Sequence, residues 1–210
     1  MKRTGLLTHD ACALLLAATG AANAETYGNT DPFEARGLIL GDYVLGVQVG
    51  IPVDDFKLES FGLMYGHEDY GEAFDSNAIF GLYTSGANGL PEHLVAVTNE
   101  IFLEEQQTYD DILFTDTSIV SSGTYWMMAL YEVGASPRAT HLDEGSVYAY
   151  WSNPYENGMP DSAPEVSTQM GADFNYWVNG TIIPAPGVLA ALGLLGVLAT
   201  RGRRVTRVER

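Results

Sequence analysis

The feature that most constrains the fold is a series of short segments rich in Tyr, Trp, Val, Ile and Phe, each bounded by Gly, Asn, Asp or Pro. Aromatic and β-branched residues favour strands, and residues 25–183 keep no helical hydrophobic period beyond a turn or two. The segments are residues 43–51, 56–61, 78–83, 93–103, 124–133, 146–151 and 173–178. About eight or nine strands with turn signals between them predict an all-β, antiparallel β-sandwich or jelly-roll-like domain. Residues 153–170, which contain three prolines, are expected to form a long surface loop.

The N-terminal residues have the pattern of an export signal. A positively charged start and an apolar run at residues 11–18 are followed by the small residues Ala22 and Ala24. Residues 1–24 are therefore expected to be a signal peptide that is cleaved after Ala24. The single cysteine, Cys12, lies within this segment, so the mature protein is expected to have no disulfide and no thiol chemistry.

The C-terminal residues contain a second hydrophobic signal. Residues 187–200 carry no charge and are rich in leucine. Fourteen helical residues span roughly 21 Å, and extending the count back to Ile182 brings the apolar segment close to the length that a bilayer core of about 30 Å requires. A cluster of basic residues then marks the cytoplasmic side of a transmembrane helix. These residues are Arg201, Arg203, Arg204 and Arg207.

Pro184, Ala185 and Pro186 precede this predicted helix. The order of proline motif, transmembrane helix and basic end resembles the sorting tail of PEP-CTERM proteins, which are exported by bacteria and carry Pro-Glu-Pro at this place. Here Ala185 stands where that motif has glutamate. The resemblance implies that residues 184–210 are a sorting signal. It implies anchoring in the cell envelope, then a cell-surface or extracellular location after processing by an exosortase-like membrane protease. The resemblance thus implies a cellular location and no enzymatic activity.

Between these signals, residues 25–183 are long enough for one domain with a substantial core. They hold 25 acidic residues against three basic ones, a net charge of −22. A surface this acidic repels nucleic acid, which is excluded as a partner, and it attracts cations. Adjacent carboxylates make a structural calcium ion a candidate, although none has the spacing of an EF-hand loop. These pairs are Asp54-Asp55, Glu104-Glu105 and Asp110-Asp111.

The sequence lacks the common catalytic and cofactor motifs. It has no Gly-x-Ser-x-Gly elbow, no His-Glu-x-x-His helix and no glycine-rich phosphate loop after a strand. The three histidines of the predicted domain are His67, His93 and His141. We therefore expect no enzyme activity, no catalytic residues, no metal-binding motif and no cofactor other than the candidate calcium ion.

The last predicted strand carries the most suggestive mixture of aromatic and polar residues. If residues 173–179 alternate, one face is polar and includes a tryptophan. This face consists of Asp173, Asn175, Trp177 and Asn179. A sugar can stack on such a ring and hydrogen-bond beside it, so the four residues predict a glycan-binding platform. Tyr148, Tyr150 and Tyr155 could extend it. The alternative is an amphipathic tryptophan half covered by a loop.

Three functional classes remain at this point. The leading one is an exported structural or interaction protein of the cell surface or extracellular matrix. The alternative is a carbohydrate-binding module for exopolysaccharide, which the aromatic residues favour. The third is a secreted hydrolase whose site has no recognisable motif.

Overall fold

The computed structural model describes residues 23–184, except for 38, 67–74, 105 and 141–146. Within this part of the chain no helix is long and apolar enough to cross a membrane. The predicted transmembrane helix at 187–200 lies outside the described residues, as do Ala22, Ala185, Pro186 and the arginine cluster.

The described residues form strands whose pairings are all antiparallel. The strands are β1 (Asn23–Gly28), β2 (Ala35–Arg36), β3 (Tyr43–Ile51), β4 (Phe56–Tyr65), β5 (Ser76–Ser85), β6 (Pro91–Val97), β7 (Ile101–Leu103), β8 (Gln107–Leu113), β9 (Ile119–Val120), β10 (Gly123–Tyr131), β11 (Arg138–Ala139), β12 (Val147–Ser152), β13 (Ser167–Met170) and β14 (Tyr176–Ile182). A single 3₁₀ turn, Tyr155–Asn157, is the only helical element among them. The predicted all-β antiparallel class is confirmed.

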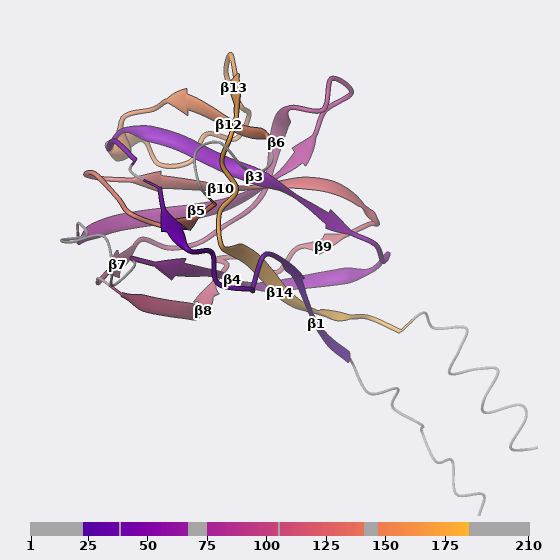
Figure 1. Cartoon of the computed structure of the whole chain (residues 1–210). Coiled ribbons are helices and arrows are strands. Elements are labelled where there is room, and N and C mark those ends of the chain that lie inside the picture. Colours follow the sequence, from indigo (N-terminus) through magenta and orange to yellow (C-terminus); the bar gives the residue numbers. More distant parts are fainter. Residues whose placement is uncertain (1–22, 38, 67–74, 105, 141–146, 185–210) are drawn as a thin grey trace, which may run out of the picture. The chain divides into compact units, whose positions relative to one another are not determined.

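The strands belong to two main sheets of unequal width (Figure 1). The narrow sheet has the order β1-β14-β4-β8, with β9 also paired to β4. The wide sheet has the order β13-β12-β3-β10-β5-β6, with β7 also paired to β5. Strands β2 and β11 form a small separate pair. Consecutive strands often change sheet, as β3, β4 and β5 do, which ties the two sheets together along the chain.

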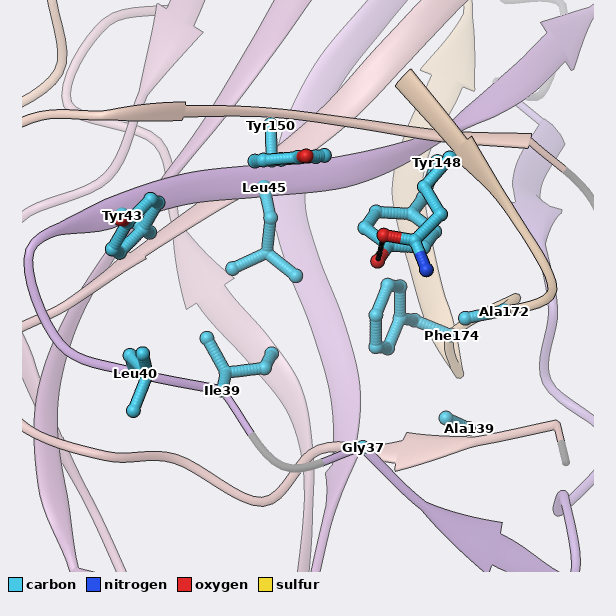
Figure 2. Close-up of a pocket in the computed structure, with 11 residues that line it drawn as sticks. Gly37, Ile39, Leu40, Tyr43, Leu45, Ala139, Tyr148, Tyr150, Ala172 and Phe174 are labelled. Carbon is cyan, nitrogen blue, oxygen red and sulfur yellow. Dashed lines mark hydrogen bonds between the residues drawn. The ribbon is translucent and has the colours of Figure 1, made fainter. Parts of the chain in front are cut away.

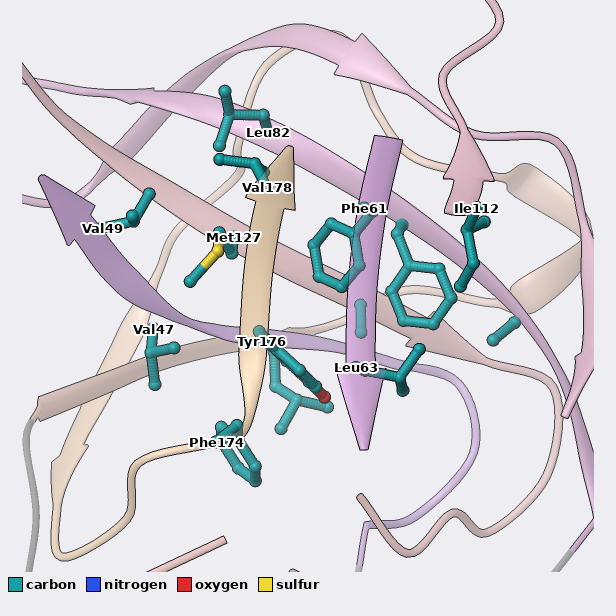
Figure 3. Close-up of a cluster of buried hydrophobic side chains, with 14 of the residues drawn as sticks. Val47, Val49, Phe61, Leu63, Leu82, Ile112, Met127, Phe174, Tyr176 and Val178 are labelled. Atoms are coloured by element: carbon teal, nitrogen blue, oxygen red, sulfur yellow. The ribbon is translucent and has the colours of Figure 1, made fainter. Parts of the chain in front are cut away.

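The main hydrophobic core lies between the inner faces of the two sheets (Figure 3). Strand alternation directs Phe61 and Leu63 of β4 inward, where they meet residues of the wide sheet. Phe61 stacks on Phe80 of β5 with 4.5 Å between ring centroids. At the buried centre the hydroxyls of Tyr131, on β10, and Tyr176, on β14, are hydrogen-bonded at 2.7 Å. This bond directly joins the two sheets.

A second hydrophobic cluster covers the outer face of the wide sheet. It contains Val44, Tyr83, Trp126, Met128, Leu130, Ala149 and Trp151. Residues 153–166, here called the covering segment, pack Tyr155, Met159, Ala163 and Val166 against it. The segment is fixed by hydrogen bonds to the sheet, from the Tyr83 hydroxyl to the Pro160 carbonyl at 2.6 Å and from the Leu94 amide to the Asp161 carbonyl at 2.9 Å. Residues 153–166 thus form a long loop at the surface, as expected, and this loop packs onto the wide sheet, whereas residues 167–170 form strand β13.

Candidate functional site

An aromatic pocket of about 320 Å³ lies beside β3 and β12 (Figure 2). Its lining residues are Gly37, Ile39, Leu40, Tyr43, Leu45, Ala139, Tyr148, Tyr150, Gln169, Ala172 and Phe174. None of these side chains carries a charge at neutral pH. The volume is at the small end of the range for ligand-binding pockets.

The unequal width of the two sheets creates this pocket. Strand β1, an edge of the narrow sheet, packs near β3, whereas the wide sheet continues past β3 to β12 and β13. Tyr148 and Tyr150 stand opposite Val47 and Leu45 in the ladder, so their side chains face the same side as the core. Beyond the narrow sheet they are met by Gly37, Ile39, Leu40, Ala172 and Phe174 in place of another strand. The space left between these segments and the two tyrosines is the pocket.

The polar groups on the pocket wall are neutral, and some of them have no hydrogen-bond partner among the described residues. The Tyr148 hydroxyl donates to Gln169 Oε1 at 2.9 Å. Burial, and secondarily the neighbouring Tyr150, raises the pKa of Tyr148, which keeps this phenol protonated at physiological pH. Within the described part of the chain, the hydroxyls of Tyr43 and Tyr150 have no hydrogen-bond partner. The pocket thus offers two free hydroxyls beside apolar ring faces.

The aromatic rings of the pocket hold one another in place. Tyr148 lies 5.7 Å from Tyr150 and 6.2 Å from Phe174, in the latter case edge to face at 80°. Phe174 in turn stacks on buried Tyr176 with 5.3 Å between centroids. Such contacts restrict the side chains before a ligand arrives, so little ordering would be needed on binding.

Two members of the predicted platform, Asp173 and Asn175, have structural partners. Asn175 is 0% exposed, and its side-chain oxygen accepts a hydrogen bond from the Phe33 amide at 2.8 Å. Its amide group donates to the carbonyls of Asn29 and Asp31. Asp173 Oδ1 accepts from the Asn29 side chain at 2.8 Å. Both side chains therefore hold residues 29–33 in place and do not form a surface for sugars.

Trp177 lies on the predicted face of β14, opposite Val178, but it is only 3% exposed. Its indole covers Gly62 on β4, where a Cβ atom would lie 2.1 Å from Trp177 Nε1. The absence of a side chain at Gly62 allows the ring to lie flat and buried. A buried ring cannot stack on a sugar, so the predicted residues do not make an open platform.

The other predicted aromatic and polar residues are divided between different regions. Asn179 borders a shallow hollow on the narrow sheet, where its amide donates to the Asp110 carbonyl at 2.7 Å. Tyr155 belongs to the covering segment, and its hydroxyl donates to Glu100 Oε2 at 2.9 Å. Tyr148 and Tyr150, named as extensions of the platform, are instead the centre of the aromatic pocket. Sequence reasoning missed Tyr43, Gln169 and the opposing wall, since these come from distant segments.

No three His, Cys, Asp or Glu side chains converge as metal ligands in the part of the chain that the structure describes. One of the candidate calcium pairs has a structural contact, since Asp54 Oδ1 accepts hydrogen bonds from the Ser122 amide at 2.8 Å and from the Ser122 hydroxyl at 2.9 Å. These bonds lower the pKa of Asp54. Glu105, His67 and His141 lie outside the described residues.

One serine, one histidine and one carboxylate do come together on the surface. Ser162 Oγ lies 3.1 Å from His93 Nδ1, and His93 Nε2 lies 3.9 Å from Glu92 Oε1. The second distance is too long for the hydrogen bond that orients a catalytic imidazole, and the two side chains are 64% and 56% exposed. The Ala163 amide donates to the Glu92 carbonyl at 2.8 Å, so this group lies where the covering segment is attached to β6.

The two ends of the described chain are neighbours. Strand β1 pairs with β14 so that Ala24 stands opposite Thr181 and Asn23 opposite Ile182. Both strands run side by side to the same end of the narrow sheet (Figure 1). The residues at which the two predicted signals join the domain therefore lie on adjacent strands.

Comparisons with protein families, with curated proteins and with solved structures find no match to this chain. The function is thus inferred from the residues, the fold and the pocket.

Proposed function

We propose that this chain is an exported, non-catalytic interaction protein of the bacterial cell surface or extracellular matrix, sorted by a PEP-CTERM-like tail. The observation that carries the proposal is the placement of the pocket relative to the two junctions. Phe174 of the pocket lies two residues before β14, and β14 ends next to the junction with the tail. Seven residues of strand extend for about 23 Å. The pocket therefore lies at the opposite end of β14 from the junction.

This arrangement suits a domain held at a membrane surface. Once residues 1–24 are removed and the segment 187–200 is inserted, the domain is attached to the membrane through the end of β14 that lies away from the pocket. An exosortase-like protease acting at Pro184, Ala185 and Pro186 would release the domain from this end without disturbing the pocket.

We further infer a jelly-roll-like topology for the domain. Eight strands form the orders β1-β14-β4-β8 and β3-β10-β5-β6, which is the interleaved arrangement of a double-sheet jelly roll. Strands β12 and β13 are an addition beside β3. This addition supplies Tyr148 and Tyr150 of the pocket.

Carbohydrate binding is the second candidate function, with exopolysaccharide as its partner. It is favoured by the uncommitted tyrosine hydroxyls beside apolar rings in the pocket. The predicted platform around Trp177 does not support it, because that ring is buried.

Fractionation of bacteria that produce the full chain tests the leading proposal. The parent protein should lose its leader and appear in the envelope and in the medium. Pro184→Ala together with Pro186→Ala should leave insertion intact, since the apolar helix is unchanged, but should trap the full-length membrane form. Replacing Arg201, Arg203, Arg204 and Arg207 by Gln should abolish stable anchoring. A cytoplasmic protein with an intact leader would contradict export, and unchanged processing of the proline variant would contradict recognition of the motif.

A further inference from the structure

We infer that the aromatic pocket binds one uncharged sugar residue, at the end of a glycan or as a short oligosaccharide. This inference rests on the proposed surface role, and it names the ligand class of that site. The site is formed by Tyr148 and Tyr150 of β12, Tyr43 and Leu45 of β3, and Phe174. Figure 2 shows these side chains directed toward one common space.

The charges of the protein disfavour anionic ligands at this site. The lining side chains are uncharged, so no lysine or arginine of the pocket can pair with a carboxylate, sulfate or phosphate. The predicted domain itself carries a net charge of −22, which repels an approaching anion. An acidic sugar such as a uronic acid is therefore disfavoured relative to its neutral counterpart.

The polar groups distinguish a sugar from a purely apolar ligand. The hydroxyls of Tyr43 and Tyr150 have no partner among the described residues, and Gln169 uses its oxygen for Tyr148. An aliphatic chain would cover these groups without bonding to them, which costs free energy for each unsatisfied group. A sugar ring offers hydroxyls that both donate and accept, and its C–H face can lie on an aromatic ring. A sugar can therefore bond to the free hydroxyls and also pack on the aromatic rings of the pocket wall.

The size of the pocket limits how much of a glycan can enter. A volume of about 320 Å³ is small for a ligand site, and Gly37, Ile39, Leu40, Ala172 and Phe174 line the pocket together with the tyrosines of β12. We therefore expect a terminal residue or a short oligosaccharide to bind better than the interior of a long chain.

Ligand-observed NMR on the full chain tests the inference. The protein is purified in a detergent without a sugar headgroup, because an alkyl glycoside would compete for the site. The probes are glucose, galactose, mannose and N-acetylglucosamine, with glucuronic acid as the charged counterpart of glucose. At least one neutral sugar should bind, and glucuronic acid should bind more weakly.

Two tyrosine variants locate the binding. Tyr150→Phe removes one pocket hydroxyl and keeps the ring, so it should weaken the binding of the neutral sugar roughly tenfold. Tyr155→Phe removes a hydroxyl from the covering segment and should leave the dissociation constant unchanged. A circular dichroism spectrum like that of the parent shows that each variant is folded. As a second measurement, Leu40→Trp at the exposed rim should hinder entry and weaken binding without altering the core.

Several outcomes would overturn the inference. They are the absence of binding by every neutral sugar, equal weakening by both phenylalanine variants, and occupation of the pocket by a fatty acid in preference to all sugars. Fractionation of cells that produce Tyr150→Phe separates this inference from the proposed function. The variant should still reach the envelope. Failure of the parent protein to be exported would count against the surface role, whatever the purified chain binds.

Discussion

The outer faces of the two sheets differ sharply. The outer face of the wide sheet carries large apolar side chains, including Trp126 and Trp151, and is buried beneath the covering segment. The outer face of the narrow sheet carries Thr26, Ser60 and Asn179, which form hydrogen bonds with one another and with neighbouring backbone. The sequence therefore shows an alternation of apolar and polar residues only for strands of the narrow sheet. A strand covered on both faces is a continuous apolar run, as in Trp126–Tyr131.

Trp177 is the exception on the narrow sheet. Its indole lies on Gly62 of β4 and is 3% exposed, and Asn175, just before β14 on the same face, holds residues 29–33. One tryptophan is thus covered by a distant part of the chain, and the other occupies the space left by a missing side chain. The two should respond differently to mutation.

The largest loss of stability should follow a mutation on the outer face of the wide sheet, which the covering segment buries. Trp126→Ala removes a buried ring that packs in the second cluster and whose Nε1 donates to the Gly89 carbonyl at 3.2 Å. Large-to-small substitution at such a site should lower the free energy of unfolding by about 3–5 kcal/mol. Chemical denaturation followed by circular dichroism measures the loss.

The matched change on the outer face of the narrow sheet, here called the open face, is Lys57→Ala. Lys57 pairs with Glu59 at 3.3 Å, but both side chains are well exposed, so the pair should contribute at most about 1 kcal/mol. Comparable losses at the two positions would mean that the covering segment does not shield the wide sheet as described.

The next largest loss of stability should come from disturbing the packing of Trp177. In Gly62→Ala the new methyl group would lie 2.1 Å from Trp177 Nε1, so the indole must move outward. We expect a loss of about 1–3 kcal/mol and a red shift of tryptophan fluorescence as one ring meets water. Gly50→Ala on β3 is the control, because a Cβ there meets no atom within 4 Å. If both variants behave like the parent, Trp177 is not held by Gly62.

Much of the fold could be predicted because its local patterns are strong. Residues 43–51 were expected as a strand and form β3, and the predicted strands at 56–61 and 78–83 lie within β4 and β5. The predicted strand at 93–103 is divided into β6 and β7, with the isolated bridge from Thr98 to Phe114 between them. Strand β8 was missed because its sequence, QTYDDIL, is mostly polar at the edge of a sheet.

The rest depends on tertiary contacts that no local pattern records. The covering segment packs Tyr155, Met159, Ala163 and Val166, whose spacing fits neither a strand nor a helix. Its prolines therefore indicated a loop, although the wide sheet beneath it requires a cover. Alternation placed Trp177 on the correct face of β14, but its burial depends on tertiary contacts such as the one with Gly62. The pocket was likewise hidden, except for the i, i+2 pair Tyr148 and Tyr150.

A smaller effect is expected at the centre, where both sheets meet. Tyr176→Phe leaves the buried Tyr131 hydroxyl without its 2.7 Å partner, which should cost about 1–3 kcal/mol. The double variant Tyr131→Phe with Tyr176→Phe should recover part of this loss, because both hydroxyls are then absent. A double-mutant cycle that shows simple additivity would contradict coupling between the two groups.

The same pair makes stability sensitive to alkali. Burial raises the pKa of both Tyr131 and Tyr176 above the ordinary value of 10.0. The unfolded chain therefore releases these protons near pH 10 while the folded protein retains them. Their contribution is complete below about pH 10, and stability should fall above it by about 1.4 kcal/mol per pH unit for each tyrosine. The double phenylalanine variant should show a shallower alkaline decline, and an unchanged slope would contradict this assignment.

The smallest effect should come from cations acting on the exposed carboxylates. The 25 acidic residues between positions 25 and 183 repel one another, and salt screens that repulsion. Sodium chloride should therefore raise the melting temperature by roughly 1–3 °C, since a change of a few tenths of a kcal/mol moves the midpoint of a domain this size by about a degree.

Calcium chloride at equal ionic strength separates screening from binding. An equal shift would indicate screening alone, whereas a much larger and saturable shift would support the candidate calcium ion of the sequence analysis. In hydrogen exchange, screening should protect the open face of the narrow sheet more than the covered face of the wide one, because the covered backbone is already shielded from solvent. Equal protection of both faces, or no response to either salt, would show that the charge is too evenly spread for the difference between the faces to matter.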